Sequence, residues 1–198
     1  VYINGQEVGY SEDSKNSAEF LINKFVKPGK NVLTLKIYRW STGSYLECQD
    51  FWRISGIERD IFLYSQPKAA LKDFRVTSTL DDTYKDGIFK LGADLRNNGS
   101  AASNMALVYE LLDAKGNVVA TGEKTADVAA GKTRTVSFDQ TLPGVKTWTS
   151  EAPNLYKLVM TVKENGKVNE IIPFNVGFRR IEIKPIEQLA GNGKPYVC

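Results

Sequence analysis

The sequence predicts an all-β protein, and two observations carry that prediction. Short runs of alternating apolar and polar residues recur along nearly the whole chain, separated by clusters of glycine, asparagine, proline and serine. In addition, no stretch of about a dozen residues places its apolar side chains at the spacing of a helical stripe. At 198 residues, the chain is long enough for one large or two small domains.

Three features before the first domain boundary predict strands. Asn4-Gly5 stands between two strand-like runs, and both residues tolerate a positive φ, so this pair predicts a tight β-hairpin. The turn formers at 27–30 lead into Asn31–Tyr38, where alternate apolar positions predict a half-buried strand. Arg59–Tyr64 is predicted to be a further short strand.

A change of texture at Ser65-Gln66-Pro67 predicts a domain boundary. Beyond it, regular strand-like runs alternate with polar turns rich in asparagine and glycine. Seven strands at this spacing over about 115 residues are typical of an immunoglobulin-like sandwich, although the Cys…Trp…Cys marker of antibody domains is missing. The predicted strands are Ala69–Thr79, Ile88–Asn97, Asn104–Asp113, Val118–Lys124, Thr133–Gln140, Tyr156–Glu164 and Asn169–Phe178.

Two segments late in this region have structural interpretations. We expect residues 148–156 to lead irregularly into a strand, with Trp148 and Tyr156 closing the end of the sandwich; a ligand role is the alternative. Residues 177–180 are expected to leave the last strand, with their two arginines solvated or paired with a neighbouring domain. The glycines and proline of 191–195 predict a turn before another strand.

The segment most informative about function is Arg39–Asp60, RWSTGSYLECQDFWRISGIERD. It combines aromatic and charged side chains in a run that does not alternate like a strand. Flat apolar rings beside charged hydrogen-bonding groups suit a polar ligand with apolar faces, such as a sugar. The alternative is a hydrophobic loop core with charges at its rim. The residues concerned are the aromatic Trp40, Tyr45, Phe51 and Trp52, the charged Arg39, Glu47, Asp50 and Arg53, and the pivots Gly43 and Gly56.

Composition excludes several classes of function. The net charge of +3 is slight and the lysines are scattered, so no nucleic-acid partner is predicted. No apolar run approaches the roughly 20 residues that cross a bilayer, and no charged-then-apolar leader opens the chain, so neither a membrane partner nor a signal peptide is predicted. Because the chain lacks histidine, Ser-His and Cys-His catalysis and most zinc sites are excluded.

Other residues with reactive groups have plain interpretations. Cys48 and Cys198 lie far apart in the sequence and are expected to be free thiols. Cys48 has no cationic neighbours except arginines, so a reactive thiolate is not predicted. Asp81, Asp82 and Asp127 are expected to be solvated charges on turns. The sequence contains neither a glycine-rich phosphate loop nor a cluster with metal-ligand spacing.

Carboxylates are the groups left for acid–base chemistry. Glycosidases use two carboxyl groups about 5 to 10 Å apart, one on each side of the scissile bond. Glu47 and Asp50 are the only acidic pair set among aromatic residues, but their spacing on a looping segment does not fix where they point. We prefer one ligand-binding or ion-binding carboxylate and one ion-pair partner for Arg39 or Arg53 over a catalytic dyad.

These residues carry a family resemblance. RWSTGSYLECQDFWRISGIERDIFLYSQP closely resembles the end of the sugar-binding jelly-roll domain of glycoside hydrolase family 2 β-galactosidases, and the residues before it resemble the central strands of that domain. WTSEAPNLYKLVM and VGFRRIEI resemble the end of the family's immunoglobulin-like domain, and GNGKPYV resembles the lead-in to its (β/α)8 barrel. SGIERDIFL would also fit β-glucuronidase and β-mannosidase relatives, whereas RWSTGSYLECQDFWR is more particular to β-galactosidases.

The resemblance implies a fragment built from two β-sandwiches. Residues 1–66 would be the later part of a jelly roll, 67–183 an immunoglobulin-like sandwich, and 184–198 the approach to a missing barrel. A chain that begins and ends inside strand-like runs agrees with that expectation, and open strand edges favour a homo-oligomer. The family's catalytic glutamates and its magnesium site lie in the barrel, so we expect no catalytic residue here and no activity from the fragment alone.

The same resemblance implies a role for Asp50. In the family, the matching aspartate contacts the galactosyl unit and a sodium ion, and a carboxylate suits both partners because its oxygens bind hard cations and accept hydrogen bonds. Cys48 stands where some members have an acidic residue, and Trp52 and Arg53 are expected to pack around Asp50. The implied function is hydrolysis of terminal β-galactosides through a covalent galactosyl-enzyme. The alternatives are a stand-alone carbohydrate-binding or adhesion module and a purely structural interaction domain.

Overall fold

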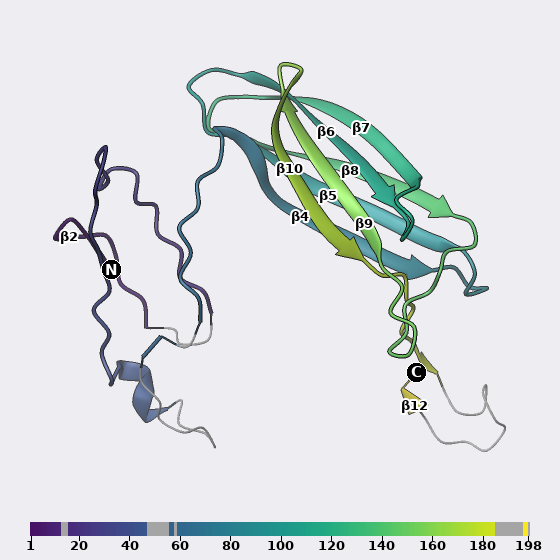
Figure 1. Cartoon of the computed structure of the whole chain (residues 1–198), viewed down its shortest axis with the longest axis horizontal. Coiled ribbons are helices and arrows are strands. Elements are labelled where there is room, and N and C mark those ends of the chain that lie inside the picture. The colour runs from purple at the N-terminus through teal and green to yellow at the C-terminus, as the bar shows by residue number, and fades with distance from the viewer. Residues whose placement is uncertain (13–15, 47–55, 58, 185–195, 198) are drawn as a thin grey trace. The chain divides into compact units, whose positions relative to one another are not determined.

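The computed structural model describes residues 1–12, 16–46, 56–57, 59–184 and 196–197 (Figure 1). Within these residues the regular structure is β, apart from one turn of 3-10 helix at Thr42–Tyr45 (η1). The predicted all-β class is therefore confirmed. The chain divides into two compact units, Val1–Tyr64 and Ser65–Cys198, which we call unit 1 and unit 2.

Unit 1 contains a three-stranded antiparallel sheet of very short strands. β1 (Tyr2–Ile3) pairs with β2 (Gln6–Glu7) on one side and with β3 (Leu33–Thr34) on the other. Asn4 and Gly5 have φ angles of 52° and 80°, the left-handed values that both central residues of a type I′ turn require. The hairpin predicted at this pair is confirmed.

Two asparagine side chains tie this sheet to the turn before β3. The Asn4 amide donates to the Phe25 carbonyl at 3.0 Å and to Asn31 Oδ1 at 2.8 Å. Asn4 Oδ1 accepts from the Val32 N–H at 3.0 Å. Asn31 Oδ1 also accepts from the Lys27 N–H at 2.9 Å, and the Asn31 amide donates back to the Lys27 carbonyl at 2.7 Å. Side-chain amides therefore supply hydrogen bonds that a longer strand ladder would otherwise make.

Two strand predictions in unit 1 are wrong. Within the predicted strand Asn31–Tyr38, only Leu33–Thr34 joins the sheet, because β1 offers two ladder positions. Leu33 and Ile37, expected to face a core, are 49% and 52% exposed. The described residues of the predicted strand at 59–64 have no ladder partner and are exposed.

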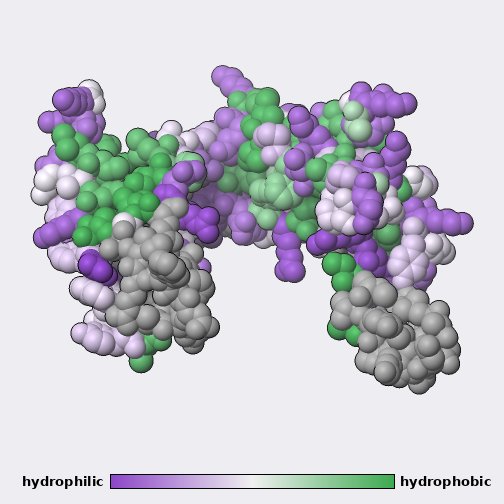
Figure 2. All heavy atoms as spheres, turned by 60° about the horizontal axis from the view of Figure 1, so that its bottom comes forward, coloured by the Kyte–Doolittle hydropathy of each residue, from purple (hydrophilic) through white to green (hydrophobic). Residues whose placement is uncertain are grey.

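Apolar side chains gather at the surface of unit 1 (Figure 2). Ile3 is the one buried hydrophobic residue among those that the structure describes in this unit. The large apolar residues left exposed are Tyr10, Leu21, Val26, Val32, Leu33, Ile37, Tyr38, Trp40, Tyr45, Leu46, Ile57, Ile61, Phe62, Leu63 and Tyr64. Apolar burial therefore contributes little to the internal packing of the described part of unit 1.

Unit 2 contains the seven strands that the sequence predicts. The largest difference concerns β7, which continues beyond the predicted end to Val128 because it pairs with β6 along its whole length. The strands are β4 (Ala69–Leu80), β5 (Gly87–Asn97), β6 (Ser103–Leu112), β7 (Val118–Val128), β8 (Thr133–Leu142), β9 (Tyr156–Glu164) and β10 (Lys167–Val176). A two-residue pair, β11 (Ile183–Lys184) with β12 (Tyr196–Val197), follows them.

The seven strands form two antiparallel sheets stacked as a sandwich (Figure 1). One sheet has the order β4-β5-β8 and the other the order β10-β9-β6-β7. The fourth strand, β7, pairs with β6 rather than with β8. This places it in the second sheet, unlike the fourth strand of antibody constant domains. The predicted immunoglobulin-like sandwich is confirmed.

The core of unit 2 lies between the sheets and follows the two-residue period of the strands. Tyr109 on β6 occupies its centre. The Tyr109 ring centroid lies 5.3 Å from that of Phe89 and 4.9 Å from that of Phe138. Its hydroxyl donates to the Gln140 side chain at 2.7 Å, so the phenol is buried with a polar partner. Burial raises the pKa of this hydroxyl.

Close packing requires glycine at two positions of the sandwich. A Cβ on Gly122 would lie 2.7 Å from the ring of Tyr109, and a Cβ on Gly87 would lie 2.8 Å from the ring of Phe178. Real Cβ atoms do not approach carbon this closely, so a side chain here would displace a buried ring. Both glycines therefore serve the core rather than a turn.

Side chains from β10 bind the backbone of β4 where the two sheets meet at their edges. The Leu71 N–H donates to the Glu170 carboxylate at 2.8 Å, and the Asn169 amide donates to the Ala69 carbonyl at 3.1 Å. Leu71 borders an irregularity in the β4–β5 register. The Phe74 and Phe174 rings meet edge to face across the same seam, with centroids 5.1 Å apart.

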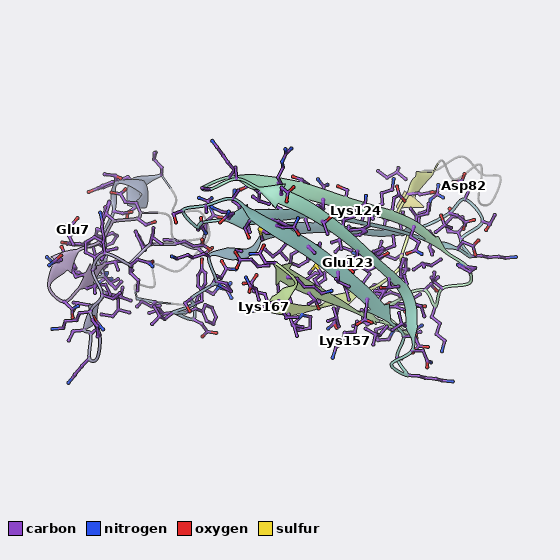
Figure 3. All side chains as sticks on the ribbon, turned by 90° about the horizontal axis from the view of Figure 1, so that it is seen from above. Glu7, Asp82, Glu123, Lys124, Lys157 and Lys167 are labelled. Carbon is purple, nitrogen blue, oxygen red and sulfur yellow. The ribbon has the colours of Figure 1, made fainter. Side chains whose placement is uncertain are left out.

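Charged side chains such as Glu123, Lys124 and Lys157 lie on the outside of the sandwich (Figure 3). Lys90 pairs with Asp139 at 3.0 Å and Lys163 pairs with Glu123 at 3.5 Å. Pairs with this degree of exposure contribute only about 0–1 kcal/mol each. These faces therefore keep the sandwich solvated and add little to its stability.

The segment before β9 closes one end of the sandwich, as predicted. Tyr156 is buried, and its ring stands at 90° to that of Phe178 with centroids 5.3 Å apart. Its hydroxyl accepts the Lys146 N–H at 2.9 Å. Trp148 is half-buried, and its main-chain N–H donates to the Phe178 carbonyl at 2.8 Å. These contacts support the structural interpretation of residues 148–156.

Candidate functional site

The predicted site lies only in part within the described residues. Asp50, the predicted substrate and sodium ligand, falls outside them. So do Glu47, Cys48, Phe51, Trp52 and Arg53. The structure does describe the approach to this segment, residues 39–46, and Gly56 beyond it, whose φ is 134°.

A single helical turn leads into the predicted site. The Ser44 N–H donates to the Ser41 carbonyl at 3.1 Å, and the Ser41 N–H donates to the Ser44 hydroxyl at 2.8 Å. The Leu46 N–H then donates to the Gly43 carbonyl at 2.9 Å. Serine favours this local turn over a strand because its hydroxyl forms hydrogen bonds with nearby backbone groups. Glycine favours it because, without a Cβ, it adopts turn conformations easily. The turn brings the chain to the residues around Asp50.

The aromatic and charged residues of the approach are only partly brought together. The Arg39 guanidinium lies 5.3 Å from the ring centroid of Trp40, a cation–π contact. Trp40 remains 54% exposed and Tyr45 is 90% exposed. Within the described residues, rings exposed to this degree are not packed into a loop core.

A surface hollow of about 520 Å³ lies beside this approach. We call it the aromatic hollow, because four of its lining residues, Tyr2, Tyr10, Tyr38 and Trp40, are aromatic. Its lining comes from β1, β2 and the segments around residues 9–12 and 36–42. The lining residues used below are Tyr10, Glu12, Lys36, Tyr38, Trp40 and Thr42.

Glu12 is the carboxylate of the aromatic hollow with defined partners. It accepts hydrogen bonds from the Tyr10 hydroxyl through Oε1 and from the Thr42 hydroxyl through Oε2. These bonds lower the pKa of Glu12, that from Thr42 most strongly. The same carboxylate raises the pKa of Tyr10. Glu12 is therefore an anionic acceptor at physiological pH, and it links the segment after β2 to the start of η1.

Lys36 and Tyr38 supply a cation and a further phenol of the aromatic hollow. The Lys36 ammonium lies 5.3 Å from the Tyr38 ring centroid. Its polar interaction with the Tyr38 side chain raises the pKa of Lys36, so the ammonium stays charged. Rings flanked by an anion and a cation have the composition of a site for a polar, hydroxylated ligand.

Sequence reasoning missed most of this lining. Tyr10 and Glu12 lie in a polar stretch after the hairpin, and Lys36 and Tyr38 lie on a predicted strand. Tyr38 could have been included, because it directly precedes Arg39-Trp40 and extends the same run of aromatic and basic residues. The contact of Glu12 with Thr42 joins residues 30 positions apart, and no local pattern indicates it.

A second, smaller hollow of about 310 Å³ lies at one end of unit 2. Its carboxylate, Glu164, accepts from the Asn169 amide at 3.1 Å and from the Ser103 hydroxyl at 2.8 Å, and both bonds lower the pKa of Glu164. The buried Asn97 amide in its wall donates to the carbonyls of Ala101 and Val128. The Glu164 and Asn97 side chains are thus committed to hydrogen bonds within unit 2.

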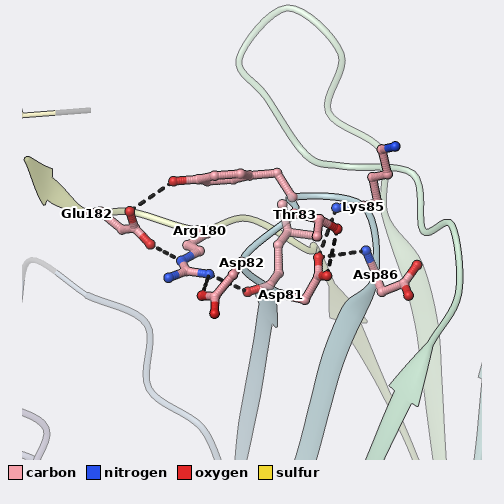
Figure 4. Close-up of polar contacts among 9 residues, drawn as sticks. Asp81, Asp82, Thr83, Lys85, Asp86, Arg180 and Glu182 are labelled. Atoms are coloured by element: carbon pink, nitrogen blue, oxygen red, sulfur yellow. Dashed lines mark hydrogen bonds and ion pairs between the residues drawn. The ribbon is translucent and has the colours of Figure 1, made fainter. Parts of the chain in front are cut away.

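The structure gives partners to charged residues of unit 2 that the sequence predicts to be solvated. The Asp82 side chain is 95% exposed on its turn, as predicted, but it also pairs with Arg180 at 2.6 Å (Figure 4). Arg180 also pairs with Glu182, whose carboxylate accepts from the Tyr84 hydroxyl at 2.9 Å. The Arg180 partners described here thus belong to its own unit. This cluster joins the chain after β10 to the β4–β5 turn.

Asp81 holds the same turn together instead of standing free in solvent (Figure 4). It accepts from the Thr83 hydroxyl at 2.7 Å and from the N–H groups of Lys85 and Asp86 at 3.0 Å. The Thr83 bond and then the Asp86 bond lower the pKa of Asp81 to about 2. Asp127 is also corrected, because it lies on β7 and accepts from the Asn104 amide at 2.7 Å.

The described residues supply neither a ready metal cluster nor a membrane-spanning helix. No group of three or more carboxylates, thiols or imidazoles lies close enough to hold a metal ion in that part of the chain. No helix there has the length and apolar character needed to cross a bilayer.

The two units define a class of protein when compared with known sequences. Residues 1–67 match the sugar binding domain of the glycosyl hydrolases family 2, and residues 69–179 match a second profile of the glycosyl hydrolases family 2. The second match covers more than half of the chain. The chain therefore belongs to glycosyl hydrolase family 2.

Within this family, the chain is similar to β-galactosidases. It is 41% identical over 186 residues to the β-galactosidase of Priestia megaterium, covering 93% of this chain and 18% of that protein. It is 40% identical over 197 residues to the β-galactosidase of Streptococcus thermophilus, covering 100% of this chain and 18% of that protein. The chain thus spans about a fifth of the length of these relatives.

Solved structures share the fold at lower identity. A β-glucuronidase from Bacteroides uniformis matches 91% of this chain and 23% of its own, with a TM-score of 0.82 and 19% identity. A putative β-galactosidase from Bacteroides fragilis matches 93% of this chain and 29% of its own, with a TM-score of 0.76 and 20% identity. At these identities the likeness concerns the fold alone.

Proposed function

We propose that this chain is part of a retaining β-galactosidase that hydrolyses terminal β-galactosides. The observation that carries the proposal is the identity of 40% to 41% with two β-galactosidases over nearly the whole chain. The chain spans 18% of those proteins, so we propose that the catalytic glutamates lie in a (β/α)8 barrel outside it. In this proposal the 198-residue chain is inactive by itself.

The proposed division of labour follows the two units. Residues 1–66 contribute the substrate-contacting segment and residues 67–183 a rigid spacer, with 184–198 leading to the barrel. The buried sandwich core supports the spacer role, because a close-packed interior deforms little and would hold the two ends of unit 2 at a fixed separation. The hydrolysis itself would pass through a covalent galactosyl-enzyme formed on a glutamate of the barrel.

Asp50 is proposed to bind the galactosyl unit and a sodium ion. Its carboxylate would accept hydrogen bonds from sugar hydroxyl groups, and its charge would favour a hard cation in the same pocket. The turn at η1, the Glu12 contact with Thr42 and the cation–π contact between Arg39 and Trp40 support this role, because they fix the chain just before Asp50. Magnesium would belong to the barrel and has no proposed ligand in this chain.

Replacing Asp50 in the full-length enzyme tests the proposal. Asp50→Asn keeps the size of the side chain but removes its charge, and we expect kcat/KM for a β-galactoside to fall on the order of 100-fold, because a charge-assisted hydrogen bond is lost. The activation by sodium should weaken in the same variant. Asp139→Asn, at an exposed ion pair of the sandwich, is the matched control and should remain active. Wild-type turnover in Asp50→Asn would overturn the assignment.

A stand-alone carbohydrate-binding module is the second candidate, and the aromatic hollow favours it. Tyr10, Tyr38 and Trp40 present rings next to charged groups without help from another domain. Titration calorimetry of the 198-residue chain with galactosides distinguishes the two functions. Clear binding supports the module, whereas absence of binding agrees with a site completed by the barrel. A purely structural interaction domain predicts no sugar binding even by the full-length protein.

We also propose that the full-length enzyme is a homo-oligomer. Those exposed apolar side chains of unit 1 that the rest of the jelly roll leaves uncovered support association, since exposed apolar surface marks interfaces. Light scattering of the full-length protein during size-exclusion chromatography measures the number of copies, and a strictly monomeric protein would contradict this proposal.

A further inference from the structure

Three Asn-Gly pairs lie in the described residues, and each can undergo the same spontaneous reaction, deamidation of the asparagine. The pairs differ in the hydrogen bonds around the reacting atoms. In this reaction the main-chain nitrogen of glycine loses its proton to hydroxide and forms a bond to the asparagine Cγ. The Cγ–Nδ2 bond breaks and ammonia leaves, closing a succinimide ring. Water then opens the ring at either carbonyl, giving aspartate or isoaspartate. The reaction needs a movable asparagine side chain and an available glycine nitrogen.

At Asn4-Gly5, hydrogen bonds hold the group that would be attacked. The Asn4 amide donates to Phe25 and Asn31, and its oxygen accepts from Val32, at 2.8 to 3.0 Å. All three bonds must break before the Asn4 Cγ can turn toward the Gly5 nitrogen. Asn4 is therefore protected at the electrophile.

At Asn98-Gly99, a hydrogen bond holds the attacking nitrogen instead. The Gly99 N–H donates to Asn97 Oδ1 at 2.7 Å. Asn97 is 1% exposed and is itself held by bonds from its amide to the Ala101 and Val128 carbonyls. The Asn98 oxygen also accepts from Arg96 Nε at 2.6 Å. This pair is therefore protected mainly at the nucleophile.

At Asn165-Gly166, neither reacting group is held. These two residues form the turn between β9 and β10, with φ angles of 47° and 80°, and both are exposed. Among the described residues, the Asn165 amide and the Gly166 N–H have no hydrogen-bond partner. The Asn165 N–H does donate to the Asn104 carbonyl at 2.9 Å, but that nitrogen takes no part in the reaction.

We propose that Asn165 is a site of spontaneous deamidation, and that Asn4 and Asn98 are kept intact by the fold. The reaction places a new carboxylate next to Glu164. Its isoaspartate product also adds one methylene to the main chain of a two-residue turn, which the β9–β10 register cannot accommodate without a local break. In this proposal, Asn165 is the Asn-Gly position of the sandwich that deamidates as the folded protein ages.

Peptide mapping by mass spectrometry tests the proposal on the folded 198-residue chain. The protein is incubated at mildly alkaline pH, and the deamidated fraction of each Asn-Gly peptide is followed with time. We expect Asn165 to react at least about tenfold faster than Asn4 and Asn98, since their bonds must open first. A folded protein in which Asn4 or Asn98 reacts as fast as Asn165 overturns the proposal. The pair Asn192-Gly193 lies outside the described residues and is followed separately.

Two controls separate the fold from the local sequence. In denaturant the three rates should converge, because only the residues of each pair then set the rate; unequal rates that persist in denaturant would contradict protection by the fold. The substitution Asn31→Ala removes one partner of Asn4, so it should speed deamidation at Asn4 and leave Asn165 unchanged. An unchanged rate at Asn4 in this variant would contradict the role of the hydrogen bonds. The denaturant comparison needs no variant, so the test stands even if Asn31→Ala folds poorly.

Discussion

Unit 1 and unit 2 are stabilised by different kinds of interaction. The sandwich of unit 2 buries an apolar core between two complete sheets, whereas the described part of unit 1 buries one apolar residue, Ile3. Unit 1 depends instead on turn conformations and on the side-chain amides of Asn4 and Asn31. Hydrogen bonds contribute about 0.5–1.5 kcal/mol each, less than the burial of a large apolar side chain. The comparison teaches that the unit that contains the predicted site and the unit with the packed core are held together by different interactions.

The largest expected effect comes from emptying the core of the sandwich. Phe178→Ala should lower the free energy of unfolding of unit 2 by about 3–5 kcal/mol, because it leaves a cavity beside Tyr156. Urea denaturation followed by tryptophan fluorescence measures this change. Leu63→Ala in unit 1, where the side chain is 81% exposed, is the matched control and should stay within about 0.5 kcal/mol of the wild type. Equal costs in the two variants would break the comparison between the units.

A smaller effect is expected from adding one methyl group to the sandwich. Gly122→Ala should cost about 1–3 kcal/mol, because its Cβ would lie 2.7 Å from the ring of Tyr109. Gly92→Ala on β5 is the control, since its Cβ would meet only Ser137, at 3.9 Å. Both variants change glycine to alanine within a strand, so the difference between their unfolding midpoints isolates the packing clash. No difference would show that the core of unit 2 is less tightly packed than its geometry indicates.

The smallest effect concerns the pH dependence of unit 2. The folded-state pKa of Asp81 is about 2, below its ordinary value of 3.8, so its ionised form stabilises the fold above about pH 4. That contribution is lost as the pH falls from about 4 toward 2, because the folded state must then accept a proton it binds weakly. Asp81→Asn should therefore show a shallower loss of stability across this window, while the difference from wild type stays constant above pH 5 or so. If the free energies of unfolding of wild type and Asp81→Asn fell in parallel between about pH 4 and 2, the proposed contribution of Asp81 would be contradicted.

Much of unit 2 could be predicted from its sequence, because alternation and turn residues are local signals. Pairs such as Asn165-Gly166 mark hairpins wherever they occur between strands. The same local reasoning fails for Asp82 and Arg180, since their pairing joins residues 98 positions apart. It also fails for Asn31–Tyr38, where alternation is present but the sheet offers few ladder partners. A strand depends on its neighbour as well as on its own pattern.

The candidate site shows the same limit. The aromatic and charged composition of Arg39–Asp60 indicates a candidate segment, and the structure adds a cation–π contact between Arg39 and Trp40 within it. The Glu12 contacts came from a segment with no comparable pattern. The role of Asp50 rests on resemblance to a family and stays a prediction, which the Asp50→Asn variant tests.

The Glu170 carboxylate, which accepts the Leu71 N–H, has a consequence for solubility. An unpaired strand edge is a template on which a second chain can add its own strand, and repeated addition leads to aggregation. The charged Glu170 side chain occupies the Leu71 N–H of β4. This edge of the sandwich is therefore less able to pair with a strand from another molecule. We therefore expect a single acidic residue to help keep concentrated solutions of this protein clear.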